Sequence, residues 1–295
     1  MSGKLFERID NAQPRFSKGQ RAIAAFIREN CDKAAFMTAA SVGKTVGVSE
    51  STVVLFAVEI GLDGYPQLQK ELQETVRNRL TSVQRMEVAN QRLGGADVLG
   101  KVLQTDIETI RRTLEITDNQ TFSNAVRDII GARKIYLMGV RSASALAAFM
   151  NHYFTHIFPD VRNIDTASTS AIFEQMLRIG PDDVFIGITF PRYSRRTLKA
   201  ALFARKSGAK VIAITDTFSA PIAGVANHIL VAKSDMASFV DSLVAPLSLI
   251  NALIVAIGIE KSADVAETYA RLETIWDEYN VYEKTEESLS DAEVD

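Results

Sequence analysis

Residues 181–216 read as one strand–loop–helix–strand unit, which restricts the chain to folds built on a parallel sheet. Val184–Phe190 and Lys210–Thr215 are short and almost continuously apolar, the pattern of strands buried on both faces. Between them, Ser194–Ser207 places its apolar residues at helical spacing. Because two parallel strands must be joined by such a crossover, the unit predicts an α/β domain.

The loop between the first strand and the helix, Thr189–Thr197 (TFPRYSRRT), is crowded with hydroxyl groups and cations. It lies where the carboxyl end of a strand meets a helix N-terminus, and there the backbone N–H groups and the helix dipole favour anions. Open parallel sheets also bind ligands at this edge. The loop therefore predicts a binding site for a phosphorylated small molecule.

The alternation of helix and strand continues on both sides of this unit and predicts a five-stranded parallel sheet covered by helices. The other expected strands are 134–140, 161–164 and 228–232, and the other expected helices are 122–130, 142–158, 167–179, 236–261 and 263–281.

A second hydroxyl-bearing loop, Gly139-Val-Arg-Ser-Ala-Ser144, follows the first of these strands. Gly139 lets the backbone approach a ligand, and Ser142 and Ser144 can donate to a phosphate. The serines could instead only cap the next helix. Two such loops at one sheet edge favour an anion site over two coincident caps.

Two short helices, Ala39–Val46 and Ser49–Ile60, flank Gly47 in the N-terminal part. A helix-turn-helix needs a small residue inside the first helix, glycine in the turn and apolar contacts from the second helix. The stretch therefore indicates DNA binding, with a merely structural helical hairpin as the alternative. The residues that carry the pattern are Val42, Gly43, Val46, Val48, Val53 and Phe56, and an earlier helix at 15–30 has Ser17 as its expected cap.

Composition describes an ordinary soluble globular protein of 295 residues, long enough for two domains. Its single cysteine, Cys31, excludes a disulfide framework and fits a reducing cytosol. No signal peptide is expected at the N-terminus. The longest apolar run, Leu243–Ile259, is interrupted by Pro246 and is shorter than the roughly 20 residues of a membrane span, so a buried helix is expected there.

Between the two patterned regions, 67–92 is expected to form a long polar helix and 98–115 an amphipathic one, and 79–119 is interpreted as a helical linker. The tail, 283–295, has six acidic residues against one lysine and is expected to be disordered.

Residues 120–260 resemble a sugar isomerase (SIS) domain, whose strand-end loops bind phosphosugars. From about residue 5 to 260 the chain resembles the RpiR family of bacterial transcriptional regulators. The resemblance rests on Phe36–Ala40, Gly47–Val54, Gly64–Pro66, Gly139–Ser144 and Ile188–Thr197. It implies an all-α helix-turn-helix domain (1–78), the linker, and a three-layer α/β SIS domain (120–282) with a five-stranded parallel sheet.

The phosphate loops depart from the SIS pattern Ser-x-Ser-Gly-x-Thr. Its outer hydroxyls fall on Thr189 and Ser194, but Pro191 and Arg192 take the Ser-Gly pair. In the first loop the usual glycine falls on Arg141. The resemblance implies that arginines replace the missing donors by charge. The expected ligand residues are Ser142, Ser144, Thr189, Arg192, Ser194 and Arg195.

The expected recognition helix contains no lysine or arginine and carries Glu50 and Glu59, whereas relatives generally have arginine where Leu55 stands. Base readout usually relies on Arg, Lys, Asn or Gln, so weak or lost DNA binding is the alternative. The expected DNA-binding residues are Ser49, Ser51 and Thr52 for most direct base contacts, Lys18, Arg21 and Lys44 for phosphates, and also Leu55.

Other chemistry is sparse. His152 and His156 have the i, i+4 spacing of a metal pair, but no third ligand is near in sequence and a packed pair is the simpler interpretation. Glu174 is the one carboxylate where an isomerase could keep its base, and a surface role is the alternative. Cys31 has no histidine nearby and is interpreted as structural.

These observations predict a cytoplasmic, non-enzymatic regulator of carbohydrate metabolism genes. Its expected partners are a double-stranded DNA operator, a phosphorylated sugar or sugar-acid effector, and further copies of the chain in a homodimer or homotetramer. No cofactor, metal or membrane is expected. The alternative function is a phosphosugar isomerase with an accessory helical domain.

Overall fold

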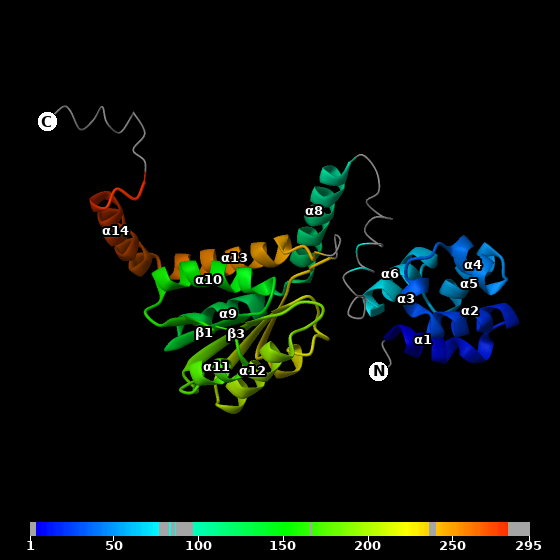
Figure 1. The fold of residues 1–295 in the computed structure, drawn as a ribbon, viewed down its shortest axis with the longest axis horizontal. Helices are drawn as coiled ribbons and strands as arrows, with labels where there is room; N and C mark the ends of the chain where they lie inside the picture. The colour runs from blue at the N-terminus through cyan, green and yellow to red at the C-terminus, as the bar shows by residue number, and fades with distance from the viewer. Residues whose placement is uncertain are drawn as a thin grey trace. The chain divides into compact units, whose positions relative to one another are not determined.

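The computed structural model describes residues 4–76, 83, 86, 97–165, 167–235 and 240–282. They form two compact units, divided mainly between Thr105 and Asp106. The first is helical and the second is α/β (Figure 1).

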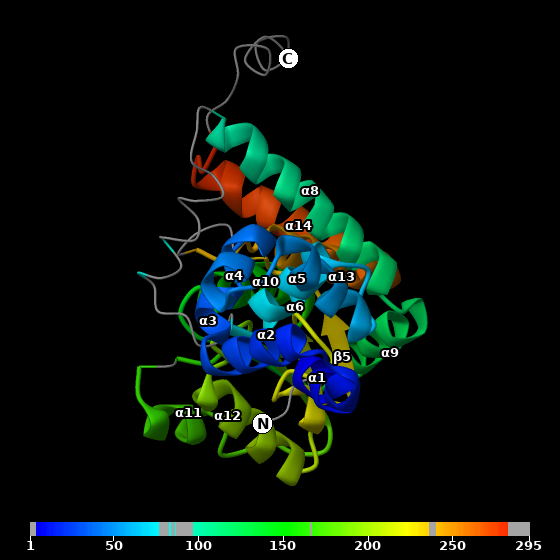
Figure 2. The same cartoon turned by 90° about the vertical axis from the view of Figure 1, so that its right-hand side faces the viewer.

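The helices of the first unit pack around one apolar core (Figure 2). Ser17 caps α2, as predicted. Its side chain accepts a hydrogen bond from the Gln20 N–H, and the Gln20 side chain accepts one from the Ser17 N–H, which completes a capping box. α1, which the sequence analysis did not predict, contributes Leu5 and Ile9 to the core. The helices are α1 Lys4–Ala12, α2 Lys18–Glu29, α3 Cys31–Ala34, α4 Ala39–Val46, α5 Glu50–Glu59 and α6 Tyr65–Val76, with a 3-10 turn at Gln13–Arg15.

The joint between α4 and α5 has the geometry predicted for a helix-turn-helix. The two axes bend by 104°, and Gly47 ends α4 in the left-handed conformation with φ of 80°. Gly43 packs directly under the turn, since a Cβ there would lie 2.8 Å from the Val48 carbonyl oxygen. Ser49 caps α5 by accepting from the Thr52 N–H.

The second unit contains the predicted five-stranded parallel sheet, in the order β2-β1-β3-β4-β5. Its three central strands are short and almost entirely buried, which explains their continuous apolar sequences, whereas the edge strands are partly exposed. They are β1 Lys134–Gly139, β2 Val161–Asn163, β3 Asp183–Ile188, β4 Lys210–Thr215 and β5 His228–Val231.

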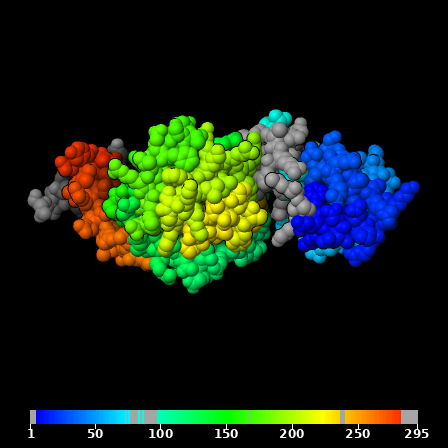
Figure 3. Space-filling model, turned by 90° about the horizontal axis from the view of Figure 1, so that it is seen from below, coloured from blue at the N-terminus to red at the C-terminus, as the bar shows by residue number. Residues whose placement is uncertain are grey.

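Helices cover both faces of the sheet, giving the three-layer fold that was predicted. α9, α10 and α13 pack on one face, and α11 and α12 on the other, which is the face turned to the viewer in Figure 3. The helices are α8 Val98–Ile116, α9 Asn119–Ile130, α10 Ala143–Ile157, α11 Thr169–Gln175, α12 Arg195–Lys206, α13 Val244–Glu260 and α14 Ser262–Glu278, with a 3-10 turn at Ala223–Val225.

Two predicted helices were too long. α11 begins after Ser168, because that side chain caps it by accepting from the Ala171 N–H, and it ends at Gln175. α13 begins only at Val244, since residues 240–243 are not helical and the Ser242 N–H bonds to the Asp235 carbonyl. The predicted tail 283–295 lies outside the described residues, as do residues 236–239. So do 77–82, 84–85 and 87–96, which belong to the predicted 67–92 helix and the first part of the predicted linker.

Leu243–Ile259, the longest apolar run, falls mainly within α13, whose inner face is buried in the core of the second unit. Among the described helices, none is both long and apolar enough to span a membrane on its own, although two bent helix pairs meet the length and composition criteria together.

Gly43→Ala should destabilise the helix-turn-helix unit by about 1–3 kcal/mol, because the added methyl group overlaps backbone that cannot move without opening the turn. Thermal unfolding of the full chain, followed by circular dichroism, measures this.

Gly258→Ala is the matched control, since a Cβ at this helical position meets nothing within 4 Å. It should be neutral or stabilise the chain by up to about 1 kcal/mol through helix propensity. Equal effects from the two variants would contradict the packing account.

Candidate ligand site and DNA-facing surface

The two predicted loops are neighbours in the structure. β1 pairs with β3 in parallel, and the register places Gly139 beside Ile188. The loops that follow these two residues therefore leave the sheet at the same edge. β2 and β3 lie on opposite sides of β1, so this is also the point where the strand order reverses. Open α/β sheets bind ligands at such switch points.

The loop after β3 is held by its own hydroxyl groups. Thr189 Oγ1 accepts from the Ser194 N–H at 3.2 Å, and Ser194 Oγ accepts from the Thr197 N–H at 3.2 Å. Ser194 is thus the cap of α12, while Arg195 stands exposed in its first turn. Both predicted hydroxyl residues lie at the helix N-terminus, where a phosphate would meet them.

In the loop after β1, Ser142 precedes α10 but its side chain makes no capping bond. The Ser144 hydroxyl donates to the Arg141 carbonyl at 2.5 Å. Gly139 also makes room for the helix that follows, because a Cβ there would overlap the Ala143 carbonyl at the start of α10.

The two loops share an unusual backbone feature. Arg141 and Arg192 have φ of 61° and 63°, and the only other described non-glycine residue with positive φ is Asn280. Each arginine stands where the SIS pattern has glycine. This chain therefore keeps the glycine-like conformation with a cationic side chain, which costs about 1–2 kcal/mol per residue. Both side chains are exposed.

Two further residues near this edge were missed by sequence reasoning. Thr197, in the first turn of α12, is 0% exposed, and in the described structure its Oγ1 has no hydrogen-bond partner. Lys233 follows β5, and its Nζ donates to the Asp216 carbonyl at 3.2 Å, which adds a cation to the carboxyl edge of the sheet. The signal for Lys233 was its position directly after an apolar strand.

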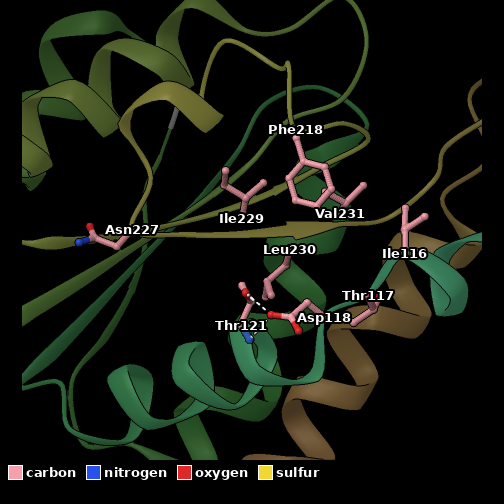
Figure 4. Close-up of a pocket in the computed structure, with 9 residues that line it drawn as sticks. All are labelled: Ile116, Thr117, Asp118, Thr121, Phe218, Asn227, Ile229, Leu230 and Val231. Atoms are coloured by element: carbon pink, nitrogen blue, oxygen red, sulfur yellow. Dashed lines mark hydrogen bonds between the residues drawn. The ribbon is translucent and has the colours of Figure 1, made fainter.

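A cavity of about 170 Å³ lies elsewhere, beside the edge strand β5 (Figure 4). Its charged group is Asp118, which caps α9; a bond from the Thr121 hydroxyl lowers the pKa of its carboxyl. A lining with a carboxylate and no cation does not suit a phosphate. It consists of Ile116, Thr117, Asp118, Thr121, Phe218, Asn227, Ile229, Leu230 and Val231.

The remaining candidates do not assemble a second site. His152 and His156 pack edge to face with 4.9 Å between ring centroids, and His156 Nδ1 lies 3.3 Å from the Tyr269 hydroxyl. Burial, and then the charge of His152, lower the pKa of His156. The described residues hold no group of three possible metal ligands. Glu174 is exposed on α11, and Cys31 is buried in the helical core.

The predicted DNA-binding residues of the first unit gather around the start of α5. The Ser49 hydroxyl lies 2.9 Å from that of Ser51 and 2.8 Å from that of Thr52. The first turn of α2 is adjacent, since a Cβ on Gly19 would lie 3.5 Å from the Thr52 methyl group. Exposed side chains on this and the neighbouring helices are Lys18, Arg21, Lys44 and Leu55.

Comparison with known proteins agrees with both halves of this description. Residues 3–79 match the model of the helix-turn-helix domain of the rpiR family, and residues 128–256 match the SIS domain. The chain belongs to the RpiR family.

This RpiR-family chain is 24% identical to the HTH-type transcriptional regulator HexR of Pseudomonas aeruginosa over 213 residues, which are 72% of this chain and 73% of that protein. The Vibrio vulnificus NanR protein, solved in complex with ManNAc-6P, is 20% identical with a TM-score of 0.56, over 92% of this chain and 98% of that one. The sugar isomerase domain of an RpiR transcription factor from Sphaerobacter thermophilus is 24% identical with a TM-score of 0.55, over 59% and 97%.

Arg141→Gly should give a protein more stable than Arg141→Ala by about 1 kcal/mol, because only glycine adopts φ of 61° without a Cβ penalty. Both variants lack the guanidinium, so the difference isolates the backbone. Urea denaturation of the two proteins gives the comparison. An alanine variant at least as stable as the glycine variant would show that this backbone is not strained.

Proposed function

We propose that this chain regulates genes of carbohydrate metabolism by binding operator DNA through α4 and α5 and a phosphorylated sugar or sugar acid through the loops after β1 and β3. The observation that carries the proposal is the union, in one chain, of an rpiR-family helix-turn-helix with a SIS domain whose hydroxyl-bearing loops meet at the strand-order reversal.

The effector site would use two kinds of donor. Ser142, Thr189 and Ser194 supply hydroxyl groups, and the N-terminus of α12 supplies backbone N–H groups and a positive dipole. The Ser144 hydroxyl, which donates to the Arg141 carbonyl, would have to turn from that carbonyl to donate to the phosphate. Arg192 and Arg195 add charge, which suits a dianionic phosphate. The bound ManNAc-6P of the Vibrio vulnificus protein supports a phosphosugar as the class of effector.

On DNA, Lys18, Arg21 and Lys44 would contact phosphates, while the start of α5 enters the major groove with Ser49, Ser51, Thr52 and Leu55. We propose a homodimer or homotetramer, because paired half-sites need paired recognition helices. The proposed domains are 1–78, a linker at 79–119 and 120–282, and the proposed location is the cytoplasm.

We propose that the SIS domain senses its ligand without transforming it. An isomerase needs a positioned acid and base at the sugar. Glu174 is exposed, and His152 and His156 lie roughly 13–20 Å along α10 from its first residue. The similar curated proteins are named as regulators, which favours the same interpretation.

A thermal-shift screen of sugar phosphates against the full chain tests the effector site. A true effector at 100 times its Kd should stabilise the SIS domain by about 2.7 kcal/mol, since it binds only the folded state. The matching unphosphorylated sugars should have no effect. Arg195→Gln should weaken binding about tenfold by removing one charge-assisted contact.

Lys199→Gln is the control, because it removes an exposed cation one turn further along the same helix. Stabilisation by unphosphorylated sugars, or equal affinity losses in the two variants, would argue against a phosphate site at the start of α12.

A further inference from the structure

One face of α5 is both exposed and apolar. Ser51, Val54, Leu55 and Val58 follow the spacing i, i+3, i+4, i+7 and form a single stripe on the helix. Leu55 is 61% exposed, Val58 53% and Val54 37%. The opposite face, with Val53, Phe56 and Ala57, is buried in the core.

This stripe is the part of a helix-turn-helix that enters the major groove. Only one feature of the base edges there is apolar, the C5-methyl group of thymine. Every other edge presents donors or acceptors, which would lose water against a leucine or valine without gaining a hydrogen bond.

We propose that Val54, Leu55 and Val58 read thymine methyl groups, so that the operator carries A·T pairs with thymine turned toward this stripe. The inference rests on the proposed DNA binding and names how the sequence is recognised. Specificity then comes from apolar contact where other helices use a charged or amide side chain.

The charges around the stripe favour DNA as its occupant. α2 and α5 begin next to each other, so two positive helix ends face the same region, flanked by Lys18 and Arg21. At the far end of α5, Glu59 Oε1 lies 3.3 Å from Arg15 Nε, which offsets the negative charge there. Glu50, exposed in the first turn of α5, opposes part of the positive charge at the start of the helix. An apolar stripe that runs from the cations of α2 to a neutral ion pair suits methyl groups beside a phosphate backbone.

Uracil in place of thymine removes the methyl group alone and gives a direct test. Operator duplexes would first be selected from a random-sequence pool by the full-length protein, and each thymine would then be replaced singly. At the thymines that face the stripe, affinity measured by fluorescence anisotropy should fall about fourfold, the factor expected for burying one methyl-sized group.

The side chain responsible is identified by a cycle of protein and DNA changes. In Leu55→Ala, replacement of one particular thymine by uracil should no longer lower the affinity. In Val58→Ala the same should hold for a different thymine. Leu177→Ala removes an exposed leucine (77%) from the α/β unit and should keep every loss of affinity caused by uracil.

A selected duplex that tolerates uracil at every position would overturn the proposal while leaving DNA binding intact. If Leu55→Ala also binds that duplex normally, the stripe covers protein instead. Failure to enrich any duplex at low salt would overturn the DNA-binding function itself.

Discussion

The parallel pairing of β1 with β3 is the constraint on which the ligand site depends. It aligns Gly139 with Ile188, so two loops far apart in sequence leave the sheet side by side. Because β2 and β3 lie on opposite sides of β1, no crossover helix fills the gap between these loops. The Thr189 and Ser194 hydroxyl groups and the α12 N-terminus therefore lie at this carboxyl edge of the sheet.

The conformation of the two loops is retained although its usual residue is not. Arg141 and Arg192 both adopt a glycine-like backbone, and Ser194 still caps the helix that a phosphate would meet. Strain of this kind persists where surrounding structure enforces it, and it is common at ligand sites. In this chain it brings two guanidinium-bearing residues into loops that otherwise rely on hydroxyl groups and backbone N–H groups.

Much of this organisation follows from local sequence. Continuous apolar runs identified the buried strands, and Ser17, Ser49 and Gly47 marked helix ends because their caps are local interactions. The predicted start of α13 was wrong because the Ser242 N–H bonds to the Asp235 carbonyl, a contact that local sequence does not signal. The backbone of Arg141 and the burial of Thr197 are tertiary effects, and neither residue type signals them. The close approach of the Ala143 carbonyl to Gly139 is likewise a packing effect that the residue type alone does not specify.

The proposed regulation requires that effector binding by the SIS domain be coupled to DNA binding by α4 and α5. The most direct measurement compares operator affinity with and without a saturating sugar phosphate, and sugar phosphate affinity with and without operator. Because the two binding events are linked, both comparisons should give the same ratio of dissociation constants, a change of about 5–150-fold. Two ratios equal to one would show that the domains bind independently, and would contradict the account.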